Sequence, residues 1–380
     1  MLYNLEITLR ARASAAQNRK ASRAYSSRLN GNSGTIDILL CVVDHFEPSV
    51  GQPPREVALG RMADWTNHYP EIAERHRDFD GRLPPHGFFY PWDEYEAEEM
   101  EALKMLVQGG YGEVDLHLHH RDDTSESLTQ KLMEAISTYS SAGVLPHWRT
   151  GALAGKPAFG FIHGNWALDN SRQDGGRNYC GVNNEIEILR DLGCYADFTF
   201  PAWGHTAQPR LTNCIYYATD NPDKPKSHNT GTLAKVGVRG KGDLLLIQGA
   251  FAPYWKRKKG VPFPAMDDSD LAHYRRYSPA RLDRWIETGV HVSGRPDRIY
   301  VKLHTHGAED KNRAILLGED FDALYSDAEK RYNDGERYRL HYVSAREMYN
   351  LVKATETAPH LSIEEARDYV LPPPEIRNKF

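Results

Sequence analysis

The sequence has little cysteine and no long apolar segment. Its four cysteines include no Cys-x-x-Cys pair, so we expect neither a disulfide framework nor a thiolate zinc site. No stretch approaches the ~18 consecutive apolar residues of a transmembrane helix. The first 30 residues also lack the apolar region of a secretory signal. We therefore expect no integral membrane segment and a cytoplasmic location.

A general excess of positive charge is also absent. The 380 residues carry a net charge of −5, which argues against a general nucleic-acid-binding protein. Only residues 1–30 depart from this balance, with six basic residues and one acidic residue. We interpret residues 1–34 as a basic N-terminal arm, either solvated or forming an extra helix. The Arg/Ser-rich, acid-poor composition is also typical of transit peptides.

From residue 36 onward, short apolar β-type runs alternate with helical segments. The expected strands are 36–43, 87–90, 113–118, 158–162, 195–200, 244–247, 299–303 and 338–343. The expected helices are 54–68, 94–108, 126–140, 184–192, 279–288 and 345–353. Strands that alternate with helices favour parallel pairing through βαβ units, so the fold class is α/β.

The domain organisation follows from the same alternation. We expect one domain over residues 35–355. The stretch 206–243 is rich in Asn, Pro, Lys and Gly, and we interpret it as an insertion that could line a cleft. Residues 356–380, which contain three consecutive prolines, form an irregular C-terminal tail.

The feature that the sequence has in abundance is histidine, with 17 residues. Seven of them fall at predicted strand ends: His45, His117, His119, His120, His163, His304 and His306. In parallel α/β folds, functional sites lie at the carboxyl ends of the strands. We therefore expect a metal site among these histidines.

Residues 117–123 give the strongest metal signal. His117 and His119 are two apart, which places both on one face of a strand, and His120 follows directly. Neutral imidazole is the commonest metal ligand near physiological pH. We expect one divalent ion, with zinc favoured over nickel, cobalt, manganese and iron. His119, His120 or Asp123 could complete the ligand set; the alternative is a histidine-rich surface loop.

The order of three motifs resembles the polysaccharide deacetylase family, of the carbohydrate esterase type within the glycoside hydrolase/deacetylase superfamily. Asp44-His45 ends the first strand, Glu113–His117 ends a later one, and Leu303-His304 ends the last. The resemblance spans about residues 36–310. It implies a distorted seven-stranded (β/α) barrel, one divalent metal ion and hydrolysis of an N-acetyl group on a sugar or polysaccharide precursor.

The resemblance also implies residue roles. Asp44 would be the general base and His304 the general acid. His45 would replace a second aspartate as a metal ligand, and His117 would be the first histidine ligand. Arg121 stands where the family has its second histidine. We therefore assign the remaining ligand positions to His119 and Asp123.

Several aromatic and polar residues near strand ends are suited to a carbohydrate substrate. Aromatic faces can stack on sugar rings, although ordinary packing gives the same pattern. The expected substrate-binding residues are Trp92, His163, Asn165, Trp166, Asp169 and His306. The basic run 256–259 could contact an anionic group, such as a phosphate on a lipid or nucleotide carrier, or form a solvated loop.

Two other functions remain open on the same fold. A glycoside hydrolase needs two carboxylates about 5–9.5 Å apart across the site. The sequence offers four for this purpose, namely Glu47, Asp93, Asp115 and Asp197. The other alternative is a catalytically silent carbohydrate-binding barrel, because the family motifs are altered here.

Overall fold

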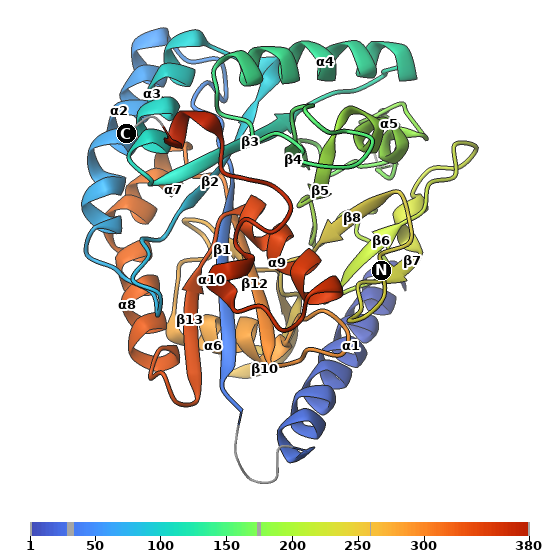
Figure 1. Ribbon diagram of the computed structural model, residues 1–380, viewed down its shortest axis with the longest axis vertical. Helices are drawn as coiled ribbons and strands as arrows, with labels where there is room; N and C mark the ends of the chain where they lie inside the picture. Colours follow the sequence, from blue (N-terminus) through green and yellow to red (C-terminus); the bar gives the residue numbers. More distant parts are fainter. Residues whose placement is uncertain (1, 29–33, 173–175, 259, 379–380) are drawn as a thin grey trace.

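A curled, mostly parallel sheet forms the centre of the protein, with helices around it (Figure 1). The computed structural model describes residues 2–28, 34–172, 176–258 and 260–378. Within these residues, eleven strands form the sheet. Ten of them follow the order β11-β12-β1-β2-β3-β4-β5-β8-β6-β7, and β13 pairs with the first half of β1.

The strands of the sheet have the following bounds: β1 (Ile36–His45), β2 (His86–Pro91), β3 (Gly112–Leu118), β4 (Phe159–His163), β5 (Cys194–Asp197), β6 (Ile215–Ala218), β7 (Gly231–Leu233), β8 (Leu244–Ile247), β11 (Asp270–Leu271), β12 (Arg298–Thr305) and β13 (Tyr338–Tyr342). Strands β6 and β7 are antiparallel to their neighbours, and the other pairs are parallel. A separate antiparallel hairpin consists of β9 (Ala252–Lys258) and β10 (Val261–Asp267).

The helices have the following bounds: α1 (Leu2–Arg28), α2 (Arg55–Ala73), α3 (Ala97–Gln108), α4 (Ser125–Ser141), α5 (Glu185–Leu192), α6 (Pro279–Thr288), α7 (Asp310–Ile315), α8 (Phe321–Tyr332), α9 (Ala345–Thr357) and α10 (Ile363–Ala366). Short helical turns are η1 (Trp92–Glu94), η2 (Ser227–Asn229), η3 (Leu316–Asp320) and η4 (Glu375–Asn378). Within the described residues, no helix combines the length and the apolar character needed to cross a membrane.

The predicted strands and helices are confirmed, and two of them have their predicted bounds, β8 and α6. Local signals explain this agreement. Pro279 opens α6 and Gly289 ends it with a left-handed backbone, φ +66°. Thr124 caps α4 by accepting a hydrogen bond from the Ser127 amide. Strands β6 and β7 lie in the predicted insertion, where they extend the sheet beyond β8.

Side chains alternate across β1 and separate two apolar layers. Ile38, Leu40 and Val42 contact the surrounding helices. Leu39, Cys41 and Val43 face the opposite way, into a second cluster that includes residues of α9. Helix α9 therefore covers the inner face of the sheet, in front of the strands in Figure 1.

Both ends of the chain contact this body. Helix α1 lies beside the hairpin, at the lower right of Figure 1, where Ile7 and Ala11 are buried against Phe251 and Met266. The described part of the predicted basic arm thus includes a long helix. The predicted irregular tail contains α10 and η4, and Arg346 of α9 donates a hydrogen bond to Asp368 within it.

The sheet does not close into a barrel through strand pairing. In the described part of the chain, β12 pairs with β11 and β1, whereas β8 pairs with β5 and β6. A buried lysine links the open sides instead. Lys302 on β12 donates hydrogen bonds to the Phe198 and Phe200 carbonyl oxygens, at 2.6 and 2.7 Å, just beyond β5.

We predict that Lys302 makes stability depend on pH. Burial lowers the pKa of Lys302 to about 7, from a usual value of 10.5. Between these values the unfolded chain keeps a proton that the folded chain has lost, so the free energy of unfolding rises with pH. Lys302→Met removes this titrating group and its pH dependence. We therefore expect the free energy of unfolding of the wild type, measured in urea, to exceed that of the variant by an amount that grows by about 2 kcal/mol from about pH 7 to about pH 9. A pH-independent difference would contradict this account.

Candidate metal centre

Three buried side chains converge at the carboxyl ends of β1 and β3. His45 ends β1, Glu47 lies two residues further on, and His117 lies near the end of β3. Their potential ligand atoms all lie within 4.8 Å of one another. Strands β1 and β3 are separated in the sheet by β2, and their side chains meet on its inner side.

In His117 and in His119, one ring nitrogen points toward Glu47 and the other is held by a hydrogen bond. His117 Nδ1 donates to the Ile162 carbonyl oxygen at 2.9 Å, which directs Nε2 toward Glu47 Oε1 at 3.0 Å. His119 Nδ1 donates to Asp93 Oδ2 at 3.1 Å, and its Nε2 lies 2.9 Å from the same Glu47 oxygen. This orientation by a carbonyl or carboxylate is typical of metal-binding histidines.

A close backbone approach makes room for His119. A Cβ atom at Gly164 would overlap the His119 ring, so only glycine fits beside the ring in this position. The His119 amide also donates to Asp93 Oδ1 at 2.8 Å. The ring is therefore held by its backbone, by Asp93 and by the shape of the loop after β4.

The electrostatics of the group require either protons or a cation. Burial would raise the pKa of Glu47, but hydrogen bonds from His117 and His119 outweigh it and hold that pKa well below its usual range. Burial likewise opposes protonation of His119, yet Asp93 and Glu47 raise its pKa to about 10. A divalent cation could take the place of these protons, because it would neutralise the same carboxylate.

Burial lowers the pKa of His117, and the same holds for His45. Burial, followed by the adjacent His306 and His117, lowers its pKa well below the usual range. Its Nδ1 atom is buried and has no hydrogen-bond partner within the described residues. A neutral, buried imidazole with an orphaned nitrogen fits a metal ligand. The set of two or three imidazoles and one carboxylate suits zinc and similar divalent ions.

A second buried group contains His120, His163, Cys180 and Glu185. His120 lies between two carboxylates, with Nε2 2.9 Å from Glu185 and Nδ1 3.1 Å from Asp123. Burial opposes its protonation, but the two carboxylates raise the pKa of His120 to about 9. A protonated imidazole has no lone pair for a metal ion. His119 of the first group shares this arrangement, so the distinguishing feature of the second group is its buried thiol, which burial keeps protonated. We interpret the second group as a buried ion pair that holds the loops after β3 and β4.

His163 resembles His45, because burial lowers its pKa well below the usual range and its buried Nε2 has no partner within the described residues. Its Nδ1 accepts the amide N–H of Asn165 at 3.1 Å, so in the neutral ring Nε2 carries the proton. Burial raises the pKa of Cys180 well above its usual range, and its thiol donates to Glu185 at 3.3 Å. Glu185 also accepts the Asp169 amide at 2.6 Å.

A small cavity of about 150 Å³ lies beside the first group. His304, His306, Asp270 and Trp166 are among its lining residues. The His306 ring stacks on His45 with centroids 4.5 Å apart, so the cavity adjoins the ligand group.

Two groups in this cavity have opposite pKa shifts. Burial, followed by Lys302 and His306, lowers the pKa of His304 well below its usual range. Burial raises the pKa of Asp270. The two residues are register partners on β12 and β11.

The structure thus brings together half of the predicted site residues. His45, His117 and His119 meet at Glu47, and three others surround the adjoining cavity, namely His304, His306 and Trp166. Trp166 has a left-handed backbone, φ +51°, and its ring lies 6.2 Å from the His45 ring.

Asp44 does not join this group. Its side chain points to the opposite face of β1, where Oδ2 lies 2.8 Å from His86 Nε2 and Oδ1 accepts the Gly307 amide at 2.6 Å. The assignment of Asp44 as the general base is therefore corrected. Strand alternation explains the difference, because adjacent residues of a strand point to opposite faces.

Asp123 also lies outside the ligand group, since it accepts hydrogen bonds from Lys131 and Ser127 and pairs with His120. Asn165 donates to the His120 and Tyr179 carbonyl oxygens, which is a structural role. Asp169 is buried beside Glu185, and burial raises its pKa to about 8. The metal assignment of Asp123 and the substrate assignments of His163, Asn165 and Asp169 are corrected accordingly.

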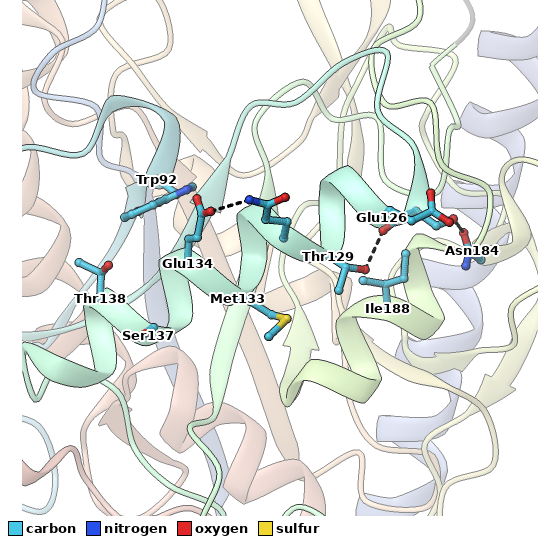
Figure 2. Close-up of a pocket in the computed structure, with 11 residues that line it drawn as sticks. Trp92, Glu126, Thr129, Met133, Glu134, Ser137, Thr138, Asn184 and Ile188 are labelled. Carbon is cyan, nitrogen blue, oxygen red and sulfur yellow. Dashed lines mark hydrogen bonds between the residues drawn. The ribbon is translucent and has the colours of Figure 1, made fainter.

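Trp92 lines a different depression, an open groove of about 950 Å³ along α4 (Figure 2). Figure 2 shows it beside α4 residues such as Glu134 and Met133, with Ile188 of α5 further along. The groove includes neither the histidine group nor the small cavity. The interpretation of Trp92 as a substrate-binding residue at the metal site is therefore corrected.

Two residues, Glu47 and Asp270, were not predicted from the sequence to belong to this site. Glu47 was considered as one of four carboxylates for a glycoside hydrolase, although its spacing of two from His45 on an extended chain places both side chains on the same side of the chain. Asp270 lies on β11, which has two residues and no apolar run to indicate a strand.

Comparisons of the chain with protein-family models, with curated proteins and with solved structures found no match.

We predict that the first histidine group binds one divalent ion. His117→Ala should reduce bound zinc or cobalt, measured by elemental analysis of tag-free protein, from about one equivalent to near zero. It should also abolish the rise in melting temperature on adding metal. Cys180→Ser is the matched control in the second group, and it should retain the metal. Metal loss in Cys180→Ser with retention in His117→Ala would contradict this assignment.

We predict a structural role for Glu185. Glu185→Gln leaves the buried His120 cation with one carboxylate fewer, which should lower the free energy of unfolding by about 3 kcal/mol. Urea unfolding at neutral pH measures this loss. Glu187→Gln, a partly exposed position on the same helix, should change stability by less than about 0.5 kcal/mol. Equal effects of the two variants would argue against the ion pair.

Proposed function

We propose that this chain is a metal-dependent hydrolase that removes an N-acetyl group from an amino sugar or polysaccharide precursor. The supporting observation is the convergence of His117 and His119 on Glu47, beside the neutral His45 and a small cavity. Each of the two imidazoles keeps one nitrogen as a donor and directs the other to the same oxygen.

The fold is compatible with this proposal. Among the described strands, eight consecutive parallel ones follow the order β11-β12-β1-β2-β3-β4-β5-β8, of which β11 has two residues. We infer that the seven from β12 to β8 correspond to a distorted seven-stranded (β/α) barrel, in which Lys302 links β12 to the segment after β5. The resemblance to polysaccharide deacetylases predicts this arrangement, with the metal at the carboxyl ends of the strands.

His45, Glu47 and His117 would hold the ion, with His119 as a fourth ligand. A bound divalent ion supplies Lewis acidity, which acidifies water and polarises the acyl carbonyl. The open side of the ligand group faces the cavity through His306, so the N-acyl group of the substrate would enter there.

His304 and Asp270 are suited to the two proton transfers. Attack of water on the amide carbon releases a proton, and the departing amine nitrogen must gain one. His304 lines the cavity and its Nδ1 has no partner in the described structure, so it is placed to accept the proton. Asp270, whose pKa burial raises, can deliver a proton to the amine. This reverses the acid role expected of His304.

A glycoside hydrolase is less well supported. Asp115 and Asp197 are fully buried below the site, where Tyr195 and Thr199 donate to them. Of the two carboxylates in the small cavity, Asp268 is ion-paired with Arg275, which leaves Asp270. A retaining or inverting mechanism needs two available carboxylates across the scissile bond. A silent carbohydrate-binding barrel would keep the site without turnover.

Acetate release from N-acetylated sugars and chito-oligosaccharides by the metal-loaded protein tests this proposal. We expect His304→Gln to lower kcat by about 10²–10⁴-fold, because the proton acceptor is lost. Trp92→Ala, in the separate groove, should leave kcat and KM unchanged. New reducing ends without acetate would support the glycosidase instead, and no turnover by metal-loaded protein would support the silent barrel.

A further inference from the structure

A larger cavity of about 620 Å³ extends from the small one at the candidate metal centre. The two share three lining residues, namely Trp203, Tyr274 and Arg275. The β9–β10 hairpin and α6 form much of its wall. Together the two cavities reach the size typical of small-molecule sites, about 300–1,000 Å³. A substrate whose acyl group reaches His304 would therefore extend into the larger cavity.

The larger cavity is strongly cationic. Its charged lining residues within the described chain are Lys256, Arg275, Arg276, Arg281, Arg284 and one acid, Asp267. Asp267 already accepts from Arg281 at 2.9 Å and from Arg284 at 3.2 Å, so one carboxylate serves two guanidinium groups. Arg275 pairs with Asp268, and Arg276 pairs with Glu319 and Asp320. Lys256 has no ion pair among the described residues, so this amine is available for an anionic ligand.

Arg284 gives a second indication of a ligand. Its Nε atom is buried and has no hydrogen-bond acceptor in the described part of the chain. Its guanidinium lies over the Tyr254 ring, 4.5 Å from the centroid, which fixes the side chain at the cavity wall. Buried donors are normally satisfied, so an orphaned guanidinium nitrogen beside an electropositive cavity fits an oxyanion acceptor.

Lys256 comes from the basic run that the sequence analysis singled out. It lines the cavity together with Tyr254, two residues earlier on β9, whereas Arg257 does not line it; both Lys256 and Arg257 are exposed to solvent. Alternation along the strand explains this split. Of the rest of the run, Lys259 lies outside the described residues.

We propose that the substrate is a phosphorylated N-acetylated amino sugar, and that this cavity binds its phosphate. The inference rests on the proposed function for the reacting end of the molecule. Several guanidinium groups and a lysine match the multiple charges and acceptor oxygens of phosphate. Trp203, Tyr254 and Phe263 add aromatic surface that can stack on a sugar or a nucleobase. Both a sugar 1-phosphate and a nucleotide diphosphate sugar carry the required chemistry.

Calorimetric titration of the metal-loaded full chain tests this inference. The probes are N-acetylglucosamine, its 1-phosphate, its uridine diphosphate derivative and uridine diphosphate alone. We expect a phosphorylated sugar to bind at least about tenfold more tightly than the neutral sugar, with an affinity that falls as the salt concentration rises. Tighter binding of both phosphorylated sugars would identify a sugar phosphate site. Tighter binding of the nucleotide sugar alone would identify a nucleotide sugar site.

Matched variants locate the contact. Lys256→Gln and Arg284→Gln should each weaken binding of the phosphorylated probe by about tenfold. Arg257→Gln, one residue along the same strand but outside the cavity, should leave it unchanged. Equal affinity for neutral and phosphorylated sugars, or equal losses in Lys256→Gln and Arg257→Gln, would overturn the inference.

The same titrations separate this inference from the proposed function. Phosphate-dependent binding by the metal-loaded wild type without any acetate release would support the anion site and contradict the hydrolase. Acetate release from neutral sugars without a preference for phosphate would support the hydrolase and contradict the anion site.

Discussion

Two imidazole nitrogens point at one carboxylate oxygen, and the rest of the site depends on this contact. His117 and His119 can both approach Glu47 only if each carries a proton or if a cation lies among them. Their other nitrogens are bound to the Ile162 carbonyl and to Asp93, which fixes the rings in this orientation. The neutral His45 adds a lone pair where further positive charge would be costly. The geometry therefore favours a divalent ion over a structural ion pair.

The second histidine group is built from similar residues, and its His120 lies between two carboxylates as His119 does. His120 has a carboxylate at each nitrogen, and Cys180 keeps its proton because burial disfavours the thiolate. Asp123 and Glu185 favour a protonated His120, and this ion pair links the loops that carry His119 and Trp166. Neither residue type nor the carboxylates at one imidazole distinguish the groups; the first group differs in His117, whose Nδ1 donates to a carbonyl oxygen instead of a carboxylate.

Much of the fold could be predicted from the sequence, because the spacing of apolar residues and the capping residues determine helices and strands locally. Strand β8 and helix α6 have their predicted bounds, and the histidines at strand ends indicated the site. Asp44 was assigned wrongly because motif order was given more weight than strand alternation. The sequence could not show that Asp123, assigned as a ligand, and His163, Asn165 and Asp169, assigned to the substrate, bind other protein groups, since their hydrogen bonds depend on loop conformation. Asp270 and the β9–β10 hairpin depend on tertiary contacts that have no periodic signal.

X-ray absorption spectroscopy of the zinc-loaded chain tests the central claim most directly. Our account predicts a first shell of nitrogen and oxygen ligands only, at about 2.0–2.2 Å, with multiple scattering from imidazole rings that decreases in His117→Ala. A sulfur ligand at about 2.3 Å would place the ion at Cys180 and Glu185 instead, and would contradict the assignment of Glu47 and its histidines.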